Sequence, residues 1–303
     1  MSVSLPLLRL VGPDALAVLA PVLVAAQAPA VAPKSADAER AASKRGFTLF
    51  RATPKALMRD FATDRPDKTE SPYTVDAGRV QVEMDMLSYS HDRTRTAGLD
   101  ETITGMAVSP LNVKLGLRHD MDLHFVIEPH VRERTRVASA GGISTQRWTG
   151  AGDLTMRLKV NAWGNDGGRT ALAVMPFVSL ARAETGERRQ LAAGVILPLA
   201  VDLGGGWGFG TMAEFDVEKH ATAAPYHVNG VLSATIGREL SGRLNAYTEL
   251  WALEGAFTDF TATWDAGLTF ALLPDVQLDG GLNVGLTRAA DVANPFLGLT
   301  FRF

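Results

Sequence analysis

The chain has 303 residues, of which 46% are hydrophobic and 21% charged, with 29 glycines, no cysteine and a formal net charge of −3. This composition excludes a disordered chain, a disulfide scaffold and thiol chemistry, and it gives no support for a nucleic-acid-binding protein. The length fits two soluble domains or one large barrel, and the mean hydropathy of +0.05 suits either.

Residues 1–30 have the features of a secretory signal peptide. Arg9 provides a weak positive region, residues 15–26 are uncharged and mostly apolar, and Ala28-Pro29-Ala30 is a small-x-small cleavage site. A membrane anchor and a disordered tail are the alternatives, and the prolines in this stretch argue against a spanning helix. We therefore expect export through the inner membrane and cleavage near Ala30.

Residues 31–77 are predicted to be a periplasmic leader or a plug inside a lumen. Thr53 and Pro54 have the residue types of a helix N-cap and first turn, which predicts a short helix near residues 53–61. The stretch after it is dense in turn formers and charges, so it cannot be a regular element. It is either a solvated loop or a plug, and the candidate plug residues are Asp64, Arg65, Asp67, Lys68, Glu70 and Tyr73.

From residue 78 onward the hydrophobic pattern has a period of two, which indicates strands. Apolar residues at 80, 82, 84 and 86 alternate with Gln81, Glu83 and Asp85, and the alternation recurs in about twelve stretches, the last ending at Phe303. Short turns such as 118–121 alternate with longer connections, of which 91–104 and 137–150 are the longest. An outer-membrane barrel has this alternation of tight turns and longer outer loops.

We therefore predict an all-β fold, an antiparallel transmembrane β-barrel of about 12 strands over residues 78–303. A soluble lipocalin-like barrel or sandwich would show the same alternation, but twelve strands are too many for a barrel filled by its own side chains. Pro176 and Pro198 fall inside strands, so we expect bulges there.

If the apolar residues face lipid, the charged residues of the strands face the lumen. The candidate lumen residues are Glu83, Asp85, Lys114, Arg118, Arg132, Arg134, Arg157, Lys159, Glu214, Asp216, Glu249, Asp265 and Asp279. Basic residues gather on the early strands and acidic residues mainly on the late ones, which predicts two walls of opposite charge. Such walls either set a transverse field across an open pore or form ion pairs that narrow the lumen, and both alternatives stay open.

Residues 64–78, with Gln81-Val82-Glu83 after them, resemble a family of bacterial outer-membrane proteins described as transporters and as components of a meta-pathway of phenol degradation. The similarity continues through 163–168, 195–206 and 285–290 and covers residues 53–303. The resemblance implies a porin-like barrel that passes small, aromatic or apolar compounds. Phe301 and Phe303 also resemble the C-terminal signal that the outer-membrane assembly machinery reads.

The first hypothesis for function is therefore an outer-membrane channel for passive diffusion of small solutes. A structural or adhesin-like barrel is the alternative, although the loops are short for an adhesin. A hydrolase is the weakest hypothesis, because His227 and Ser233 are roughly 20 Å apart along an extended strand. We predict no catalytic residue, no cofactor and no metal site, and expect the partners to be outer-membrane lipid, the assembly machinery and a small solute.

Overall fold

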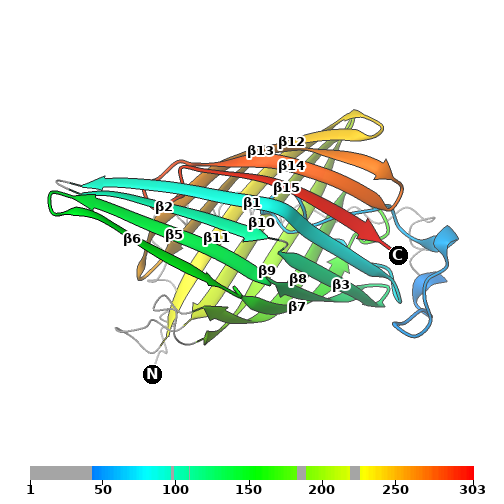
Figure 1. The fold of residues 1–303 in the computed structure, drawn as a ribbon. Coiled ribbons are helices and arrows are strands. Elements are labelled where there is room, and N and C mark those ends of the chain that lie inside the picture. The colour runs from blue at the N-terminus through cyan, green and yellow to red at the C-terminus, as the bar shows by residue number, and fades with distance from the viewer. Residues whose placement is uncertain (1–42, 97–98, 109, 183–188, 219–225) are drawn as a thin grey trace, which may run out of the picture.

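The structure is a computed structural model that describes residues 43–96, 99–108, 110–182, 189–218 and 226–303. Its strands form one antiparallel sheet that closes on itself, because the last strand pairs with the first (Figure 1). The strands are β1 (Val80–Thr96), β2 (Leu99–Val108), β3 (Leu111–Arg118), β4 (Met121–Ile127), β5 (His130–Ser139), β6 (Gly142–Gly150), β7 (Leu154–Trp163), β8 (Thr170–Arg182), β9 (Arg189–Gly204), β10 (Trp207–Glu218), β11 (His227–Ser241), β12 (Leu244–Gly255), β13 (Thr258–Leu273), β14 (Val276–Gly285) and β15 (Ala293–Arg302).

The strands occupy twelve positions around the barrel, as the sequence predicts, because three of these positions hold two shorter strands in place of one continuous strand. β2 and β3 both pair with β1, β5 pairs with β2 while β4 pairs with β3, and β6 pairs with β5 while β7 pairs with β4. Pro110 follows the first interruption site and Pro129 lies in the second. A proline has no amide hydrogen for the ladder, so the strands break at these positions.

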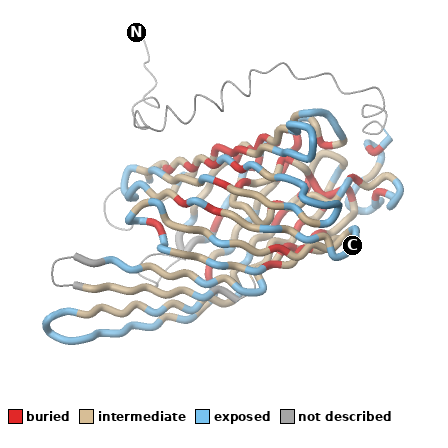
Figure 2. The backbone as a smooth tube through the Cα atoms, turned by 90° about the horizontal axis from the view of Figure 1, so that it is seen from above, coloured by how far each residue is buried: buried red, intermediate tan, exposed pale blue. Residues whose placement is uncertain are grey.

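The two ends of the barrel differ. One rim carries the C-terminal residue Phe303, the leader that precedes β1 and the short turns, and we call it the terminal end (Figure 1). At the opposite rim, the loop end, the sheet made of β1, β2, β5 and β6 extends beyond the other strands (Figures 1 and 2). We call this four-stranded part the extension.

The burial pattern distinguishes a membrane barrel from a soluble one. Lys114 and Lys159 on the inner face are 2% and 0% exposed, whereas Leu250 and Phe260 on the outer face are 56% and 54% exposed. A soluble barrel places its apolar side chains inside, so this inverted arrangement is that of a barrel surrounded by lipid. Among the described residues no helix is long and apolar enough to cross a membrane.

The expected long loops at 91–104 and 137–150 are wrong, because most of these residues belong to the extension. β1 continues to Thr96, β2 begins at Leu99, and β5 and β6 meet at a turn near residues 140–141. Polar residues occupy both faces of these strands, so they lack the hydrophobic alternation on which the prediction depended.

The expected helix near residues 53–61 is reduced to one turn of 3₁₀ helix, Lys55–Leu57. Met58 is already extended, and the next amide, that of Arg59, donates to the Asp76 carboxylate at 2.9 Å instead of to a helical carbonyl. A tertiary contact therefore ends the helix that the local sequence favours.

The expected bulges at Pro176 and Pro198 are also wrong. Pro198 pairs with Met212 and Pro176 with Val195 in continuous registers. Between β7 and β8 the pairing skips from Arg157↔Phe177 to Val160↔Val174 without a change in register. The ladder therefore tolerates a missing amide by a local gap in its pairing.

Candidate functional site: the occupied lumen

Residues 59–77, which we call the lumen segment, run through the inside of the barrel before the chain enters β1. Their side chains and backbone amides contact inner-face residues on most strands of the barrel. These contacts include Glu83 on β1, Lys114 on β3, Asp122 on β4, Asn161 on β7, Met212 on β10, Ser233 on β11, Glu249 on β12, Thr263 on β13 and Asp279 on β14. The segment therefore contacts opposite walls of the lumen, and we call these contacts the charged bridge.

The acidic residues of the segment bind the basic wall. The carboxylate of Asp64 lies between two lysines, with Lys114 Nζ 2.5 Å from Oδ2 and Lys159 Nζ 2.6 Å from Oδ1. All three side chains are at most 5% exposed. Further along the segment, Glu70 forms an ion pair with Arg157 on β7.

The basic residues of the segment bind the acidic wall. Arg65 forms ion pairs of 2.5 Å with Asp85 on β1 and 2.7 Å with Asp279 on β14. Lys68 Nζ lies 3.2 Å from Asp265 on β13 and 4.8 Å from the ring centroid of Trp251. Each of these four charged residues of the segment, Asp64, Arg65, Lys68 and Glu70, therefore faces wall charges of the opposite sign.

Glu249 on β12 binds the backbone of the segment as well as a side chain. Its carboxylate accepts hydrogen bonds from the amides of Lys68 and Thr69, each at 2.8 Å, and from the Thr69 hydroxyl at 2.5 Å. The same hydroxyl lies 2.6 Å from Ser233 Oγ on β11. Three donors to one buried carboxylate fix the position of the segment at its centre.

The pairing decides between the two alternatives for the charged walls. A buried charge without a partner costs several kcal/mol, and an ion pair in a low dielectric offsets much of that cost. Lys114, Lys159, Glu249 and Asp279 are all at most 2% exposed and all contact the segment. These buried charges of the walls are therefore paired with the segment, which is the arrangement that the second alternative describes.

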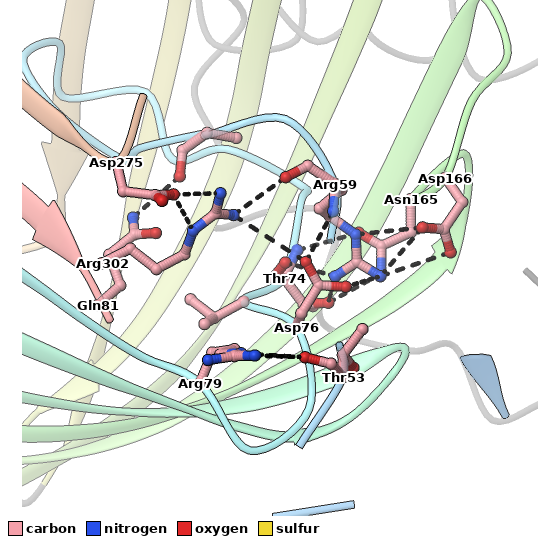
Figure 3. A network of polar contacts seen from close by, with 12 residues as sticks. Thr53, Arg59, Thr74, Asp76, Arg79, Gln81, Asn165, Asp166, Asp275 and Arg302 are labelled. Carbon is pink, nitrogen blue, oxygen red and sulfur yellow. Dashed lines mark hydrogen bonds and ion pairs between the residues drawn. The ribbon is translucent and has the colours of Figure 1, made fainter. Parts of the chain in front are cut away.

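A cluster at the terminal end anchors the segment before it leaves the lumen (Figure 3). The Arg59 guanidinium donates to the Thr74 carbonyl at 2.6 Å, to the His119 carbonyl at 2.6 Å and to Asp166 at 3.3 Å. Lys44 Nζ lies 2.6 Å from Asp166 and 3.0 Å from Asp76. Burial acts to raise the pKa of Asp166, but the positive charges of Arg59 and Lys44 hold this pKa below its usual value.

The last strand joins the same cluster. Arg302 on β15 donates to the Asp275 carboxylate at 2.6 Å and to the Arg59 carbonyl at 3.1 Å (Figure 3). Its guanidinium carbon also lies 5.3 Å from the centroid of the Phe61 ring. The β7–β8 turn, the β13–β14 turn and the final strand therefore hold the entry of the segment together.

The inner face also carries an apolar cluster on β8 to β12. Its members are Met175, Ile196, Met212 and Val231, with Phe177, Trp251 and Leu253 packed against them. Val231 is nearer the loop end than Ser233, which contacts Thr69, and Leu253 is nearer the loop end than Glu249. The cluster therefore begins beside the segment and continues toward the loop end.

The family model described as "Putative MetA-pathway of phenol degradation" matches residues 63–303. The chain belongs to this family. The match begins inside the lumen segment, so the family's shared region includes both the charged bridge and the barrel. No curated protein matches the chain.

Solved structures of other proteins are similar to this family member. An outer membrane channel from Pseudomonas putida F1 is 12% identical, with a TM-score of 0.50 over 80% of this chain and 100% of that one. The NanC porin is 10% identical, with a TM-score of 0.45 over 73% and 98%, and the NalP translocator domain from Neisseria meningitidis is 8% identical, with a TM-score of 0.48 over 74% and 88%. The likeness to the Pseudomonas putida protein shows a β-barrel fold of the outer-membrane type, which supports an outer-membrane location.

The structure places most of the candidate lumen residues on the inner face. Those that contact the segment or its direct partners are Glu83, Asp85, Lys114, Arg157, Lys159, Glu249, Asp265 and Asp279. Glu214 and Asp216 share the inner face of β10 with Met212, which accepts a hydrogen bond from the Glu70 amide at 3.3 Å.

Three candidates lie elsewhere. Arg118 is at the terminal end, with its side chain 60% exposed, and Arg132 and Arg134 are exposed on the extension. The interruption at Pro129 separates β5 from β4. Even-numbered residues face the lumen on β4 but face outward on β5, so the assignment of every second residue to the inner face fails after the break.

The remaining candidates belong to the segment and the last strand. Asp67 lines a cavity of about 390 Å³ with Tyr247 at the terminal end, and the Tyr73 carbonyl accepts from Lys159 at 3.5 Å. Phe301 and Phe303 stack at 6.2 Å, and Phe303 is 64% exposed.

Sequence reasoning missed the anchoring cluster. Arg59, Asp76 and Asp166 lie far apart in the chain, and Asp166 sits in a glycine-rich turn that a hairpin explains by itself. Ser233, a weak nucleophile candidate, bonds to Thr69, while His227 packs edge-on against Phe257 at 5.3 Å. Within the described ranges, no group of three or more His, Asp or Glu residues could hold a metal ion.

Proposed function

We propose that the protein is an outer-membrane channel for passive diffusion of small solutes, and that the lumen segment is its gate. The observation that carries this proposal is the set of ion pairs that the segment forms with both walls. Its members in the segment are Asp64, Arg65, Lys68 and Glu70. A filler needed only for stability could be apolar, because replacing buried ion pairs by hydrophobic residues is often neutral or stabilising. Ion pairs can be broken one by one, which suits a segment that moves.

The apolar cluster on β8 to β12 supports small aromatic or apolar compounds as the solutes. Phe177, Trp251 and Leu253 give one side of the lumen a surface for a flat apolar molecule, while the acidic residues of β10 lie nearby. Binding pockets for such compounds are mainly apolar with a few polar groups that set orientation. This assignment also agrees with the family's description.

Single-channel conductance in planar bilayers tests the gate. The purified mature protein is compared with a variant that lacks residues 31–77, after heat-modifiability on gels has shown that both barrels are folded. We expect low or rare conductance for the complete chain and a several-fold larger, steady conductance for the variant. Equal conductance of the two proteins would rule out a gating role for the segment. Zero conductance in both folded proteins would rule out a channel function.

The extension favours the adhesin-like barrel as a second candidate function, because β1, β2, β5 and β6 extend beyond the rim like a platform (Figure 2). That function needs no conductance in either protein of the experiment above, so the same recording separates the two candidates.

We also propose that residues 1–30 are removed on export and that Phe303 is read during barrel assembly. The first thirty residues lie outside the described ranges, and the proposal rests on their sequence. The intact mass of protein purified from outer membranes tests the cleavage site, with a mature N-terminus near Val31 as the expected result.

A further inference from the structure

The extension has an outward face that continues the lipid-facing surface of the barrel. On β1, Leu87 pairs with Leu297 of β15, and both are exposed apolar residues. Counting in steps of two from Leu87, the same face carries Tyr89, His91 and Arg93. The outward face of the extension is therefore fixed by its register with the apolar belt.

The row at Tyr89 marks the upper edge of this belt. Tyr89 pairs with Met106 on β2, and Met106 pairs with Arg132 on β5. Tyr89 and Met106 are 40% and 37% exposed. A tyrosine at the top of a lipid-facing strand sits at the level where acyl chains give way to headgroups.

Arginines occupy this row and the rows above it. Arg132 shares the row of Tyr89, Arg134 pairs with both Thr104 and Arg147 in the next row, and Arg136 follows one row higher. Successive rows are about 7 Å apart along a strand. Four guanidinium groups therefore gather on β5 and β6 at headgroup depth, and we call Arg132, Arg134, Arg136 and Arg147 the arginine patch.

The patch lacks carboxylate partners in the described chain. Arg93, at the edge of the same face, pairs with Asp100 at 2.5 Å. The four patch residues form no ion pair within the described ranges, and three of them are exposed. Arg134 even lies directly opposite Arg147, although like charges in opposed positions destabilise a sheet.

We propose that the arginine patch binds the phosphate groups of the glycolipid that forms the outer leaflet, the lipid A part of lipopolysaccharide. Guanidinium groups bind phosphate through paired, charge-assisted hydrogen bonds, and a bound phosphate removes the repulsion between Arg134 and Arg147. The acyl chains of the same molecule lie against the apolar belt directly below.

The apolar belt explains why a lipid, and not free phosphate, fits this surface. β4 shares a strand position of the barrel with β5, and β7 shares one with β6, so β4 and β7 lie nearer the membrane centre. Their exposed apolar residues are Ile127, Leu154 and Met156, with exposed fractions of 36%, 41% and 45%. A ligand that spans both zones needs phosphates at one end and hydrocarbon at the other.

Lipid binding to the purified protein tests the proposal. The triple variant Arg132→Ser, Arg134→Ser and Arg147→Ser is compared with a matched control, Arg118→Ser, Arg169→Ser and Arg243→Ser, which removes three arginines at the terminal end. Native mass spectrometry after addition of bis-phosphorylated lipid A counts bound molecules. We expect at least a five-fold loss of bound lipid in the patch variant and no loss in the control.

A second arm uses the wild-type protein alone, so it stands even if the patch variant fails to fold. Bis-phosphorylated lipid A is compared with the same lipid after enzymatic removal of both phosphates and with inorganic phosphate. Strong binding of the phosphorylated lipid only is the expected result. Equal binding of both lipids, or full retention of lipid by a folded patch variant, overturns the proposal, and binding of inorganic phosphate with equal affinity shows an anion site that does not recognise lipid.

Discussion

Lys159 Nζ lies 2.6 Å from Asp64 Oδ1, which joins β7 to a segment 95 positions earlier in the chain. Lys159 is fully buried, and its other hydrogen bond in the described chain is a 3.5 Å contact with the Tyr73 carbonyl. The charge of this lysine is therefore compensated by the lumen segment and not by the barrel wall. The docking of the segment inside the barrel and the burial of the wall charges therefore depend on each other.

Replacing Asp64 is expected to open the channel. Asp64→Ala leaves Lys159 buried without a carboxylate, and breaking one partner of a buried pair costs about 3–5 kcal/mol. The cost falls on the docking of the segment, because the ladder of the barrel does not involve Asp64. Single-channel recordings should show a higher open probability than wild type.

Asp67→Asn is the matched control for this experiment. Asp67 is a second aspartate, three residues later in the segment, and it forms no ion pair within the described residues. Its substitution is expected to leave the open probability near that of wild type. Equal behaviour of the two variants would contradict a specific role for the Asp64 pairs.

Exchanging charges across the acidic wall is expected to restore closure. Arg65→Glu places a carboxylate between Asp85 and Asp279, so it should increase conductance several-fold. Asp279→Arg in the same chain provides a new cation for Glu at position 65 and should recover part of the closed state. A double-mutant cycle on open probability measures the coupling, and strictly additive effects would show that the two residues do not interact.

A disulfide between the segment and β11 is expected to lock the channel. The natural chain has no cysteine, and Thr69 Oγ1 lies 2.6 Å from Ser233 Oγ, so Thr69→Cys with Ser233→Cys brings two thiols together. The oxidised protein should stay closed, and a reductant should return wild-type behaviour. In the control pair, Thr69→Cys with Ser179→Cys, the second residue bonds to Thr155 instead of the segment, so no bridge should form.

Acid is expected to loosen the leader at the terminal end. The pKa of Asp166 is lowered in the folded protein by Arg59 and Lys44, so its contribution is complete above its ordinary value of 3.8 and disappears as the pH falls through the lowered value. Limited proteolysis with an acid-active protease should therefore cut the leader faster below about pH 4. In Asp166→Asn this pH dependence should be much weaker, and an unchanged profile would assign it to other groups.

Phe303 is expected to matter for assembly more than for stability. Its side chain is 64% exposed and, among the described residues, its ring stacks on that of Phe301 alone, so Phe303→Ala removes little packing. If the assembly machinery reads this residue, the amount of folded barrel in outer membranes should fall several-fold. Protein refolded in detergent should melt within a few degrees of wild type, and normal membrane levels would remove the proposed signal.

Much of the barrel could be predicted from the sequence. A strand with lipid on one face and charge on the other alternates with a period of two, so residues 154–160 and 260–270 could be assigned directly. The extension could not, because polar residues occupy both of its faces and the alternation disappears. Arg132 was assigned to the wrong face of the sheet for a related reason. The alternation of inner and outer residues along β4 does not continue past Pro129.

The lumen segment shows the limit of local information. Its charges and turn formers exclude a helix or strand over residues 63–78, but a free loop and a plug have the same composition. The 3₁₀ turn at Lys55–Leu57 shows the same limit, because the Arg59 amide that would extend the helix bonds to Asp76.

The alternation of apolar and charged residues is enough to predict a closed membrane barrel with apolar residues outside and charges inside, because strand periodicity is a local property. The pairing of the charged walls with residues 59–77 could be found only in the folded chain, because each ion pair joins residues far apart in the sequence. Burying an unpaired charge costs several kcal/mol. A wall lysine such as Lys159 must find a carboxylate, and the fold, not the local pattern, determines which one is within reach.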